Sequence, residues 1–308
     1  MGAQQIIERE RRWATPAATA AVLTFALYVA SFVVDRTASL YTGASDAQQL
    51  QSLHDHAGTI LLASVIRAAA FLALPIPLLY LFRAAQARNP RIQSTMVAFI
   101  FIGPILFAAQ GVVQAVGAGQ AASDFVGLPT EQKQTYAQFQ AELKRDPSSI
   151  EKVTIYTVHN QLEVQRNNNT FYEVIDFGKS DPQKTVSDLP GKLESASPSV
   201  AHDTDTDTEA QAGDARATHT TDNSSTLQVS QALLFPAVLG LVVMMIYVPL
   251  QAQRVGLLSR FFGSFGMALG ASMILILPVA LLGVLVWVGY LGLLFAGRAP
   301  GGRPPAWE

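Results

Sequence analysis

The chain has 308 residues, of which 50% are hydrophobic and only 14% are charged. Soluble domains carry roughly 25% charged residues, and here the apolar residues also lie in long uninterrupted blocks. The composition therefore excludes an ordinary soluble protein and predicts a polytopic α-helical membrane protein. No cysteine is present, which excludes disulfides, thiolate metal sites and cysteine nucleophiles.

Four apolar blocks come close to the ~20 residues that cross ~30 Å of hydrocarbon. They are residues 14–34, 57–82, 95–117 and 227–250. The first block has a longer apolar core than a signal peptide and lacks a small-x-small cleavage site after it, so we expect a retained helix. Pro75 and Pro77 predict a kink in the second block, and Pro104 predicts one in the third.

The fifth apolar block, residues 263–296, is long enough for two short helices. Arginines flank it on both sides, and a turn at Pro278 near its midpoint gives a hairpin. The alternative is one long tilted helix. A small face of Gly263, Gly266 and Gly270 predicts close helix packing at the start of this block.

Arginine-rich short loops predict the orientation, because such loops stay in the cytoplasm. Arginines precede the first block, follow the second and flank the fifth, whereas the segment of residues 35–56 has one arginine and three aspartates. We therefore expect a plasma-membrane protein with a cytoplasmic N-terminus and with residues 119–226 outside the cytoplasm. The hairpin gives six spans and a cytoplasmic C-terminus; the single tilted helix gives five spans.

The expected fold is an all-α membrane helical bundle with a small β-containing extracytoplasmic insert. Residues 1–120 hold spans one to three, residues 121–226 form the outer loop, and residues 227–308 hold spans four to six and a cytoplasmic tail. The outer loop contains all six lysines of the chain and has 17 acidic against 9 basic residues. This change of composition indicates a segment added to the membrane body, either acquired by the protein itself or grafted onto it.

Three parts are expected within the outer loop. Residues 129–145 have a helical pattern, with Tyr136, Phe139 and Leu143 on one face. Residues 152–177 read as two or three short antiparallel strands with an asparagine-rich turn. The low-complexity remainder, residues 195–225, has almost no large apolar residue and predicts a disordered acidic linker.

The linker contains Asp203, Asp205 and Asp207 in the spacing of a calcium-binding loop. Thr208 stands where the loop needs glycine, and Asp214 stands where it needs glutamate. A solvated linker is therefore favoured over a calcium site, and no metal or cofactor is expected.

Five polar residues fall in the outer half of the predicted spans, where lipid offers no hydrogen-bond partner. They are Arg67, Gln110, Gln114, Gln228 and Gln231. Arg67 lies ~12 Å below the outer boundary, and Asp35 is the best placed acid to pair with it. The set forms either an outward-facing vestibule that binds an anion or interhelical contacts that hold the bundle together. In a third interpretation, Arg67 extends its side chain to the headgroups.

The sequence contains no hydrolase, zinc-protease, phosphate-loop or dinucleotide motif. We therefore expect no enzyme and no nucleic-acid binding. The leading hypothesis is a structural or interaction protein that anchors the extracytoplasmic loop in the lipid bilayer, where residues 121–226 meet a protein partner. The alternative is a small-solute or ion transporter, or a sensor, that uses a vestibule around Arg67.

Two segments resemble a known group of proteins. The segments are "RVGLLSRFFGSFG" at residues 254–266 and "GRAPGGRPPAWE" at residues 297–308. The chain resembles uncharacterised multi-pass integral membrane proteins of high-GC Gram-positive bacteria, which share the Gly-Gly-x-Pro-Pro-Ala-Trp-Glu segment. The resemblance implies the hairpin and a cytoplasmic tail, and it implies no activity.

Overall fold

The computed structural model describes residues 3–38, 45–127, 134–207, 210–299 and 304–307. The chain forms two compact units, which we describe separately. The first, here called the bundle, consists of Met1–Thr37, Gly58–Val116 and Thr226–Glu308. The second, here called the sheet unit, consists of Ala38–Ala57 and Gly117–Ser225.

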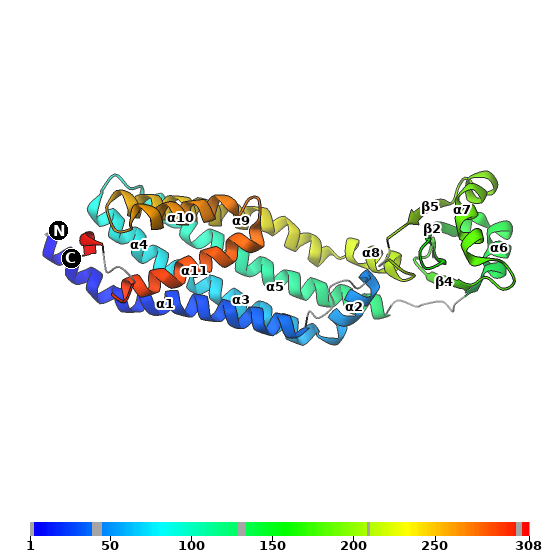
Figure 1. Ribbon diagram of the computed structural model, residues 1–308, viewed down its shortest axis with the longest axis horizontal. Helices are drawn as coiled ribbons and strands as arrows, with labels where there is room; N and C mark the ends of the chain where they lie inside the picture. Colours follow the sequence, from blue (N-terminus) through cyan, green and yellow to red (C-terminus); the bar gives the residue numbers. More distant parts are fainter. Residues whose placement is uncertain (1–2, 39–44, 128–133, 208–209, 300–303, 308) are drawn as a thin grey trace. The chain divides into compact units, whose positions relative to one another are not determined.

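The bundle is built from long apolar helices (Figure 1). They are α1 (Ala3–Ala38), α3 (Ala57–Ala73), α4 (Pro75–Arg88), α5 (Val97–Gly127), α9 (Ser225–Arg254), α10 (Arg260–Ser272) and α11 (Leu277–Phe295). Short 3-10 turns, η1 (Ser94–Met96) and η3 (Pro305–Trp307), precede α5 and end the described chain. A buried core of leucine, alanine and aromatic side chains connects these helices.

Five helical segments are long and apolar enough to cross a membrane. They are Glu10–Arg36, Ala57–Arg88, Ser94–Gly127, Ser225–Arg254 and Leu277–Phe295. The second segment is interrupted at Leu74, between α3 and α4. Pro75 causes this break because its ring lacks an N–H and clashes with the preceding turn. The predicted membrane-length helices and the interruption predicted at Pro75 are therefore present, whereas α5 continues through Pro104.

The fifth apolar block contains two helices instead of one. α10 and α11 run in opposite directions and are joined by Met273–Ile276, directly before Pro278 (Figure 1). α10 has 13 residues and rises only about 20 Å, less than the ~30 Å of a hydrocarbon core. The predicted turn is present, but α10 is too short to cross the hydrocarbon fully, so six complete spans are not confirmed.

Glycines bring several helices of the bundle into close contact. A Cβ atom on Gly103 of α5 would lie 2.6 Å from the carbonyl carbon of Gly240 of α9, so the two backbones touch. A Cβ on Gly266 would lie 2.8 Å from the Trp287 ring, and one on Gly270 would lie 2.9 Å from Met245 Cβ. The small face predicted on α10 is therefore a packing surface.

The sheet unit contains five strands in the order β1-β4-β3-β2-β5. They are β1 (Gln134–Thr135), β2 (Ile150–Tyr156), β3 (Gln161–Arg166), β4 (Phe171–Asp176) and β5 (Ala201–Asp205). β2, β3 and β4 form the predicted antiparallel meander, and β1 and β5 add parallel edge strands. Asn169 adopts φ 59° in the predicted asparagine-rich turn, a conformation that asparagine tolerates.

One face of this sheet is apolar and packs on two helices. α6 (Tyr136–Arg145) begins with a capping box at Thr135 and Gln138, and it places Tyr136 and Phe139 in the core. α7 (Pro182–Ala196) adds Val186, Leu189 and Leu193 to that core. The predicted helix is thus present from Tyr136 onward, whereas residues 129–133 of its range lie outside the described residues.

The predicted disordered linker instead forms a strand and a helix over about half of its length. Residues 201–205 form β5, which pairs with β2, and Asp214–Asp222 form α8. α8 packs against α2 (Asp46–Asp55) and the end of α5, where Leu50, Ala122, Phe125 and Ala217 form a small buried cluster. Backbone pairing holds β5 in place, and packing of small alanine side chains holds α8. These two elements therefore need few large apolar side chains of their own.

Candidate functional site

The predicted pairing of Arg67 with Asp35 is present in the bundle. Arg67 Nη2 on α3 donates to Asp35 Oδ2 on α1 over 3.2 Å, and the two side chains are 30% and 39% exposed. Arg67 Nε is buried without a hydrogen-bond partner. The ion pair joins α1 to α3.

The glutamines of the predicted polar set lie on two other helices. Gln110 and Gln114 face the same side of α5, and Gln110 Nε2 donates to Gln114 Oε1 over 2.9 Å. Gln110 is buried, while Gln228 and Gln231 on α9 are exposed. The structure thus brings Arg67 to Asp35 and Gln110 to Gln114, and a vestibule formed by all six residues stays a prediction.

A denser polar cluster lies at the end of the bundle where both chain termini are found (Figure 1). We call it the Arg88 cluster; it consists of Glu10, Tyr80, Arg88, Ala306 and Trp307. Arg88 forms a bidentate ion pair with Glu10, in which Nη1 contacts Oε1 and Nη2 donates to Oε2 over 3.0 Å. The two side chains are only 20% and 9% exposed. Such paired donors fix geometry as well as charge.

Arg88 also binds the C-terminal segment. Its guanidinium donates to the carbonyl oxygens of Ala84 and Ala306 and lies 5.8 Å from the Trp307 ring centroid. Trp307 Nε1 donates to the Leu257 carbonyl over 2.9 Å. The indole stacks on Tyr80 with the ring centroids 5.7 Å apart. The Pro-Ala-Trp segment is therefore held by side-chain and backbone contacts from α4 and the loop after α9.

Tyr80 connects the Arg88 cluster to α1. Its hydroxyl donates to the Glu10 carbonyl over 3.1 Å, and its ring contacts Phe295 edge-on at 4.8 Å between the centroids. The cluster therefore fastens the start of α1, α4, the end of α11 and the C-terminal segment to one another.

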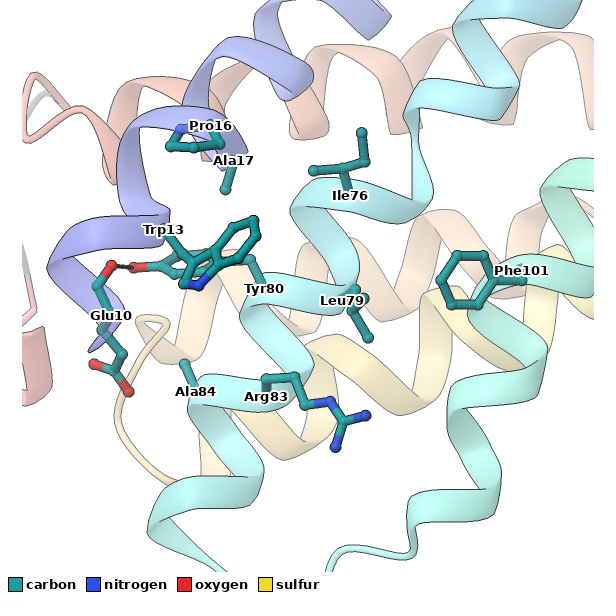
Figure 2. Close-up of a pocket in the computed structure, with 10 residues that line it drawn as sticks. All are labelled: Glu10, Trp13, Pro16, Ala17, Ile76, Leu79, Tyr80, Arg83, Ala84 and Phe101. Carbon is teal, nitrogen blue, oxygen red and sulfur yellow. Dashed lines mark hydrogen bonds between the residues drawn. The ribbon is translucent and has the colours of Figure 1, made fainter. Parts of the chain in front are cut away.

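A cavity of about 600 Å³ opens beside this cluster. It lies between α1 and α4, with one residue from α5, and we call it the α1–α4 groove (Figure 2). Its lining residues are Glu10, Trp13, Pro16, Ala17, Ile76, Leu79, Tyr80, Arg83, Ala84 and Phe101. Most of this lining is apolar, and Glu10 and Arg83 are its charged residues.

The sheet unit contains a buried carboxylate, Glu163, on the face opposite to its apolar core. Glu163 Oε2 accepts hydrogen bonds from Gly213 N at 2.9 Å, Ala215 N at 3.0 Å and the Tyr156 hydroxyl at 3.0 Å, and Oε1 accepts one from Arg216 N at 3.1 Å. The carboxylate thus caps the N-terminus of α8 from strand β3. Burial raises the pKa of Glu163, against the lowering effect of these hydrogen bonds.

An acidic groove of about 480 Å³ lies on the same face of the sheet. Asp203, Asp205 and Asp207 line it, together with aspartates from α2 and α8. Asp203 pairs with Lys152 over 3.6 Å. Among the described residues, no group of three or more potential metal ligands is close enough to bind an ion. Asp203 and Asp205 belong to a strand, which is not the conformation of a calcium-binding loop.

Reasoning from the sequence missed the Arg88 cluster and Glu163. A signal for the first was available in Glu10, an acid among the arginines that precede the first span, and in the tryptophan of the C-terminal motif. No local signal marks Glu163, because its alternating pattern is that of an ordinary strand. Comparisons with known protein families, with curated proteins and with solved structures find no match to this chain.

Proposed function

We propose that the protein is a plasma-membrane anchor whose bundle presents the sheet unit outside the cytoplasm to a protein partner. Five membrane-length helices support the membrane location. The acidic surface around Asp203, Asp205 and Asp207 supports a partner with a basic binding surface, because complementary charge accelerates and orients association.

The Arg88 cluster is the observation that best supports the proposed membrane topology. Glu10 near the N-terminus and Trp307 near the C-terminus contact the same arginine. This shared contact supports placing Glu10 and Trp307 on one side of the membrane, which corresponds to an even number of crossings. Arginines dominate that side, so it is the cytoplasmic side, and α10 and α11 together form a cytoplasm-to-cytoplasm hairpin.

The tip of this hairpin, Met273–Ile276, lies within the hydrocarbon in our proposal. Ile274, Leu275 and Ile276 are 69%, 84% and 52% exposed, which suits contact with lipid acyl chains. The backbone amides of the tip bond to carbonyls of the last turn of α10, at 2.9 to 3.4 Å. Backbone groups satisfied in this way are tolerated in a membrane, so the short α10 suffices.

Single cysteines test this topology, since the chain has none of its own. A membrane-impermeant maleimide should label Lys179→Cys in intact cells, whereas Arg91→Cys and Arg298→Cys should react only after permeabilisation. Leu275→Cys should resist labelling in both conditions. Labelling of Arg298→Cys in intact cells would show five spans and contradict the hairpin.

The anchoring role has a separate test. Deleting residues 146–223 should leave the bundle folded, with the same labelling of Arg91→Cys and Arg298→Cys, and should abolish cross-linking to the extracytoplasmic partner. Aggregation of the deleted protein would show that the loop is part of the membrane fold and would refute the anchor proposal.

A second candidate function is a small-solute or ion transporter, or a sensor, with an outward-facing vestibule around Arg67. One observation favours it: Arg67 Nε–H is buried and unpartnered, and such a donor suits a carboxylate or another anion. Interhelical binding of α1 to α3 explains the remaining contacts of Arg67 equally well, so the anchor remains the leading proposal.

A further inference from the structure

We propose that the α1–α4 groove binds an anionic phospholipid, with the phosphate on Arg83 and one acyl chain along the apolar floor. This inference rests on the proposed membrane location and orientation. It goes beyond the anchoring role because it assigns a lipid-binding site to a particular surface of the bundle.

The groove has the shape of an acyl-chain site. On α4, the lining residues Ile76, Leu79, Tyr80, Arg83 and Ala84 recur every three or four positions and therefore share one face. The rise from Arg83 to Ile76 is about 10 Å. A chain whose phosphate lies at Arg83 would therefore run roughly two helical turns into the hydrocarbon.

The opposite wall belongs to α1 and α5. Pro16 and Ala17 of α1 lie near Ile76, and Phe101 of α5 adds a lining residue on the other side of Ile76 and Leu79 (Figure 2). Trp13, Ile76 and Phe101 are 58%, 47% and 38% exposed. These exposed apolar surfaces would face lipid in a membrane, which favours an acyl chain over a water-soluble ligand.

The charges in the groove favour an anionic headgroup. Glu10 is neutralised by its two bonds to Arg88. Arg83 donates to the neutral Gln86 Oε1 over 3.0 Å and forms no ion pair with the carboxylates that the structure describes. Figure 2 shows its guanidinium directed away from Glu10. One positive charge therefore remains at the mouth of the groove.

The position of the groove in the bilayer agrees with this assignment. It lies at the arginine-rich end, where exposed Arg11 and Arg12 on α1 add positive charge. Trp13 and Tyr80 supply aromatic rings at the depth where such rings prefer to lie, next to the headgroups. Basic pockets between helices on the cytoplasmic side are suited to anionic lipid headgroups.

The test measures lipid binding to the purified full-length protein in detergent by native mass spectrometry. We expect phosphatidylglycerol to bind more tightly than phosphatidylcholine of the same chain length. Arg83→Gln should weaken phosphatidylglycerol binding about fivefold, while the control Arg91→Gln, which removes an exposed arginine outside the groove, should leave it unchanged. Ile76→Trp should also weaken binding, by filling the acyl-chain path with Arg83 intact.

Three results would overturn the proposal. They are equal binding of the two lipids, equal loss in Arg83→Gln and Arg91→Gln, and competition by inorganic phosphate at the concentration of lipid phosphate, which would show a free-anion site. If Arg83→Gln fails to fold, phosphatidylglycerol binding to Ile76→Trp becomes the deciding measurement. Unaltered binding to Ile76→Trp would then overturn the proposal. The cysteine labelling above reports on the topology alone, so a failed lipid site and a failed topology are distinguishable.

Discussion

Arg88 and Glu10 are 78 positions apart in the chain, yet they form a two-pronged ion pair that is largely shielded from solvent. Neither charge has another described partner of opposite sign within the cluster, so each depends on the other. Removal of one partner of such a pair leaves an uncompensated buried charge, which costs more than the pair itself contributes.

Glu10→Gln should therefore destabilise the bundle. We expect the free energy of unfolding to fall by about 3 kcal/mol, measured by denaturation in detergent with tryptophan fluorescence. Glu8→Gln is the matched control, because Glu8 is an exposed acid on the same helix, and it should change stability by less than about 0.5 kcal/mol. Equal effects of the two variants would show that the ion pair does not hold α1 to α4.

Trp307→Ala should release the C-terminal segment from the bundle. The variant loses the stacking on Tyr80 and the hydrogen bond to Leu257, which together amount to about 2 kcal/mol. Trp307→Phe retains a ring but loses the hydrogen bond and should cost about 1 kcal/mol. Limited proteolysis measures the release as faster removal of the C-terminus.

The control for this release is Trp13→Ala, which removes an exposed indole at the same end of the bundle. It should leave the rate of C-terminal proteolysis unchanged. Equal protection in Trp307→Ala and the unmodified protein would contradict the docking of this segment.

The long apolar helices were predictable because composition alone identifies a membrane span, with no need for periodicity. The Arg67–Asp35 pair was predictable for a similar reason: the spans offer few acids, and only Asp35 lies at a suitable depth. The Arg88 cluster could not be predicted as a set of contacts, because it joins residues near the two chain ends to α4 and to the loop after α9. Only the path of the chain through the bundle brings these residues together.

The order in residues 201–205 and 214–222 was not predictable from composition, because its source lies elsewhere in the chain. β5 is held by backbone pairing to β2, and the N-terminus of α8 is capped by Glu163 of β3. A segment with few large apolar residues folds when a distant partner supplies its hydrogen bonds.

Gly240→Ala should separate α5 from α9. Its Cβ would lie 2.7 Å from the Gly103 Cα, closer than real Cβ atoms approach other atoms, and the obstacle is backbone. We expect a loss of at least about 3 kcal/mol in the free energy of unfolding in detergent. Gly111→Ala on α5 is the control, since nothing lies within 4 Å of its Cβ, and it should be neutral or stabilising by up to about 1 kcal/mol.

Arg67→Leu tests the role of the outer ion pair. If the pair holds α1 to α3, the single variant should lose about 1–2 kcal/mol, because Asp35 is left without its partner, and the double variant Arg67→Leu with Asp35→Leu should regain most of that loss. Thermal unfolding in detergent measures both. A double variant that is stable but has lost an anion-dependent stabilisation present in the unmodified protein would instead support the vestibule.

The docking of α8 on the sheet should strengthen as the pH falls. Burial raises the pKa of Glu163 above its ordinary value, so folding favours its protonated form. Such a group contributes stability that is fully present below its unfolded pKa and is lost as the pH rises through its folded pKa. Asp46 on α2 shifts in the same direction, because of burial and the nearby Asp214.

Hydrogen exchange in the full-length protein measures this effect as the protection factors of the α8 amides, corrected for the intrinsic pH dependence of exchange. Protection should be greater at pH 5 than at pH 7.5, and Glu163→Gln should remove most of the difference because it cannot titrate. Glu151→Gln, at an exposed acid on β2, should retain the difference. Protection that falls on acidification would mean that the four hydrogen bonds to the carboxylate outweigh its burial.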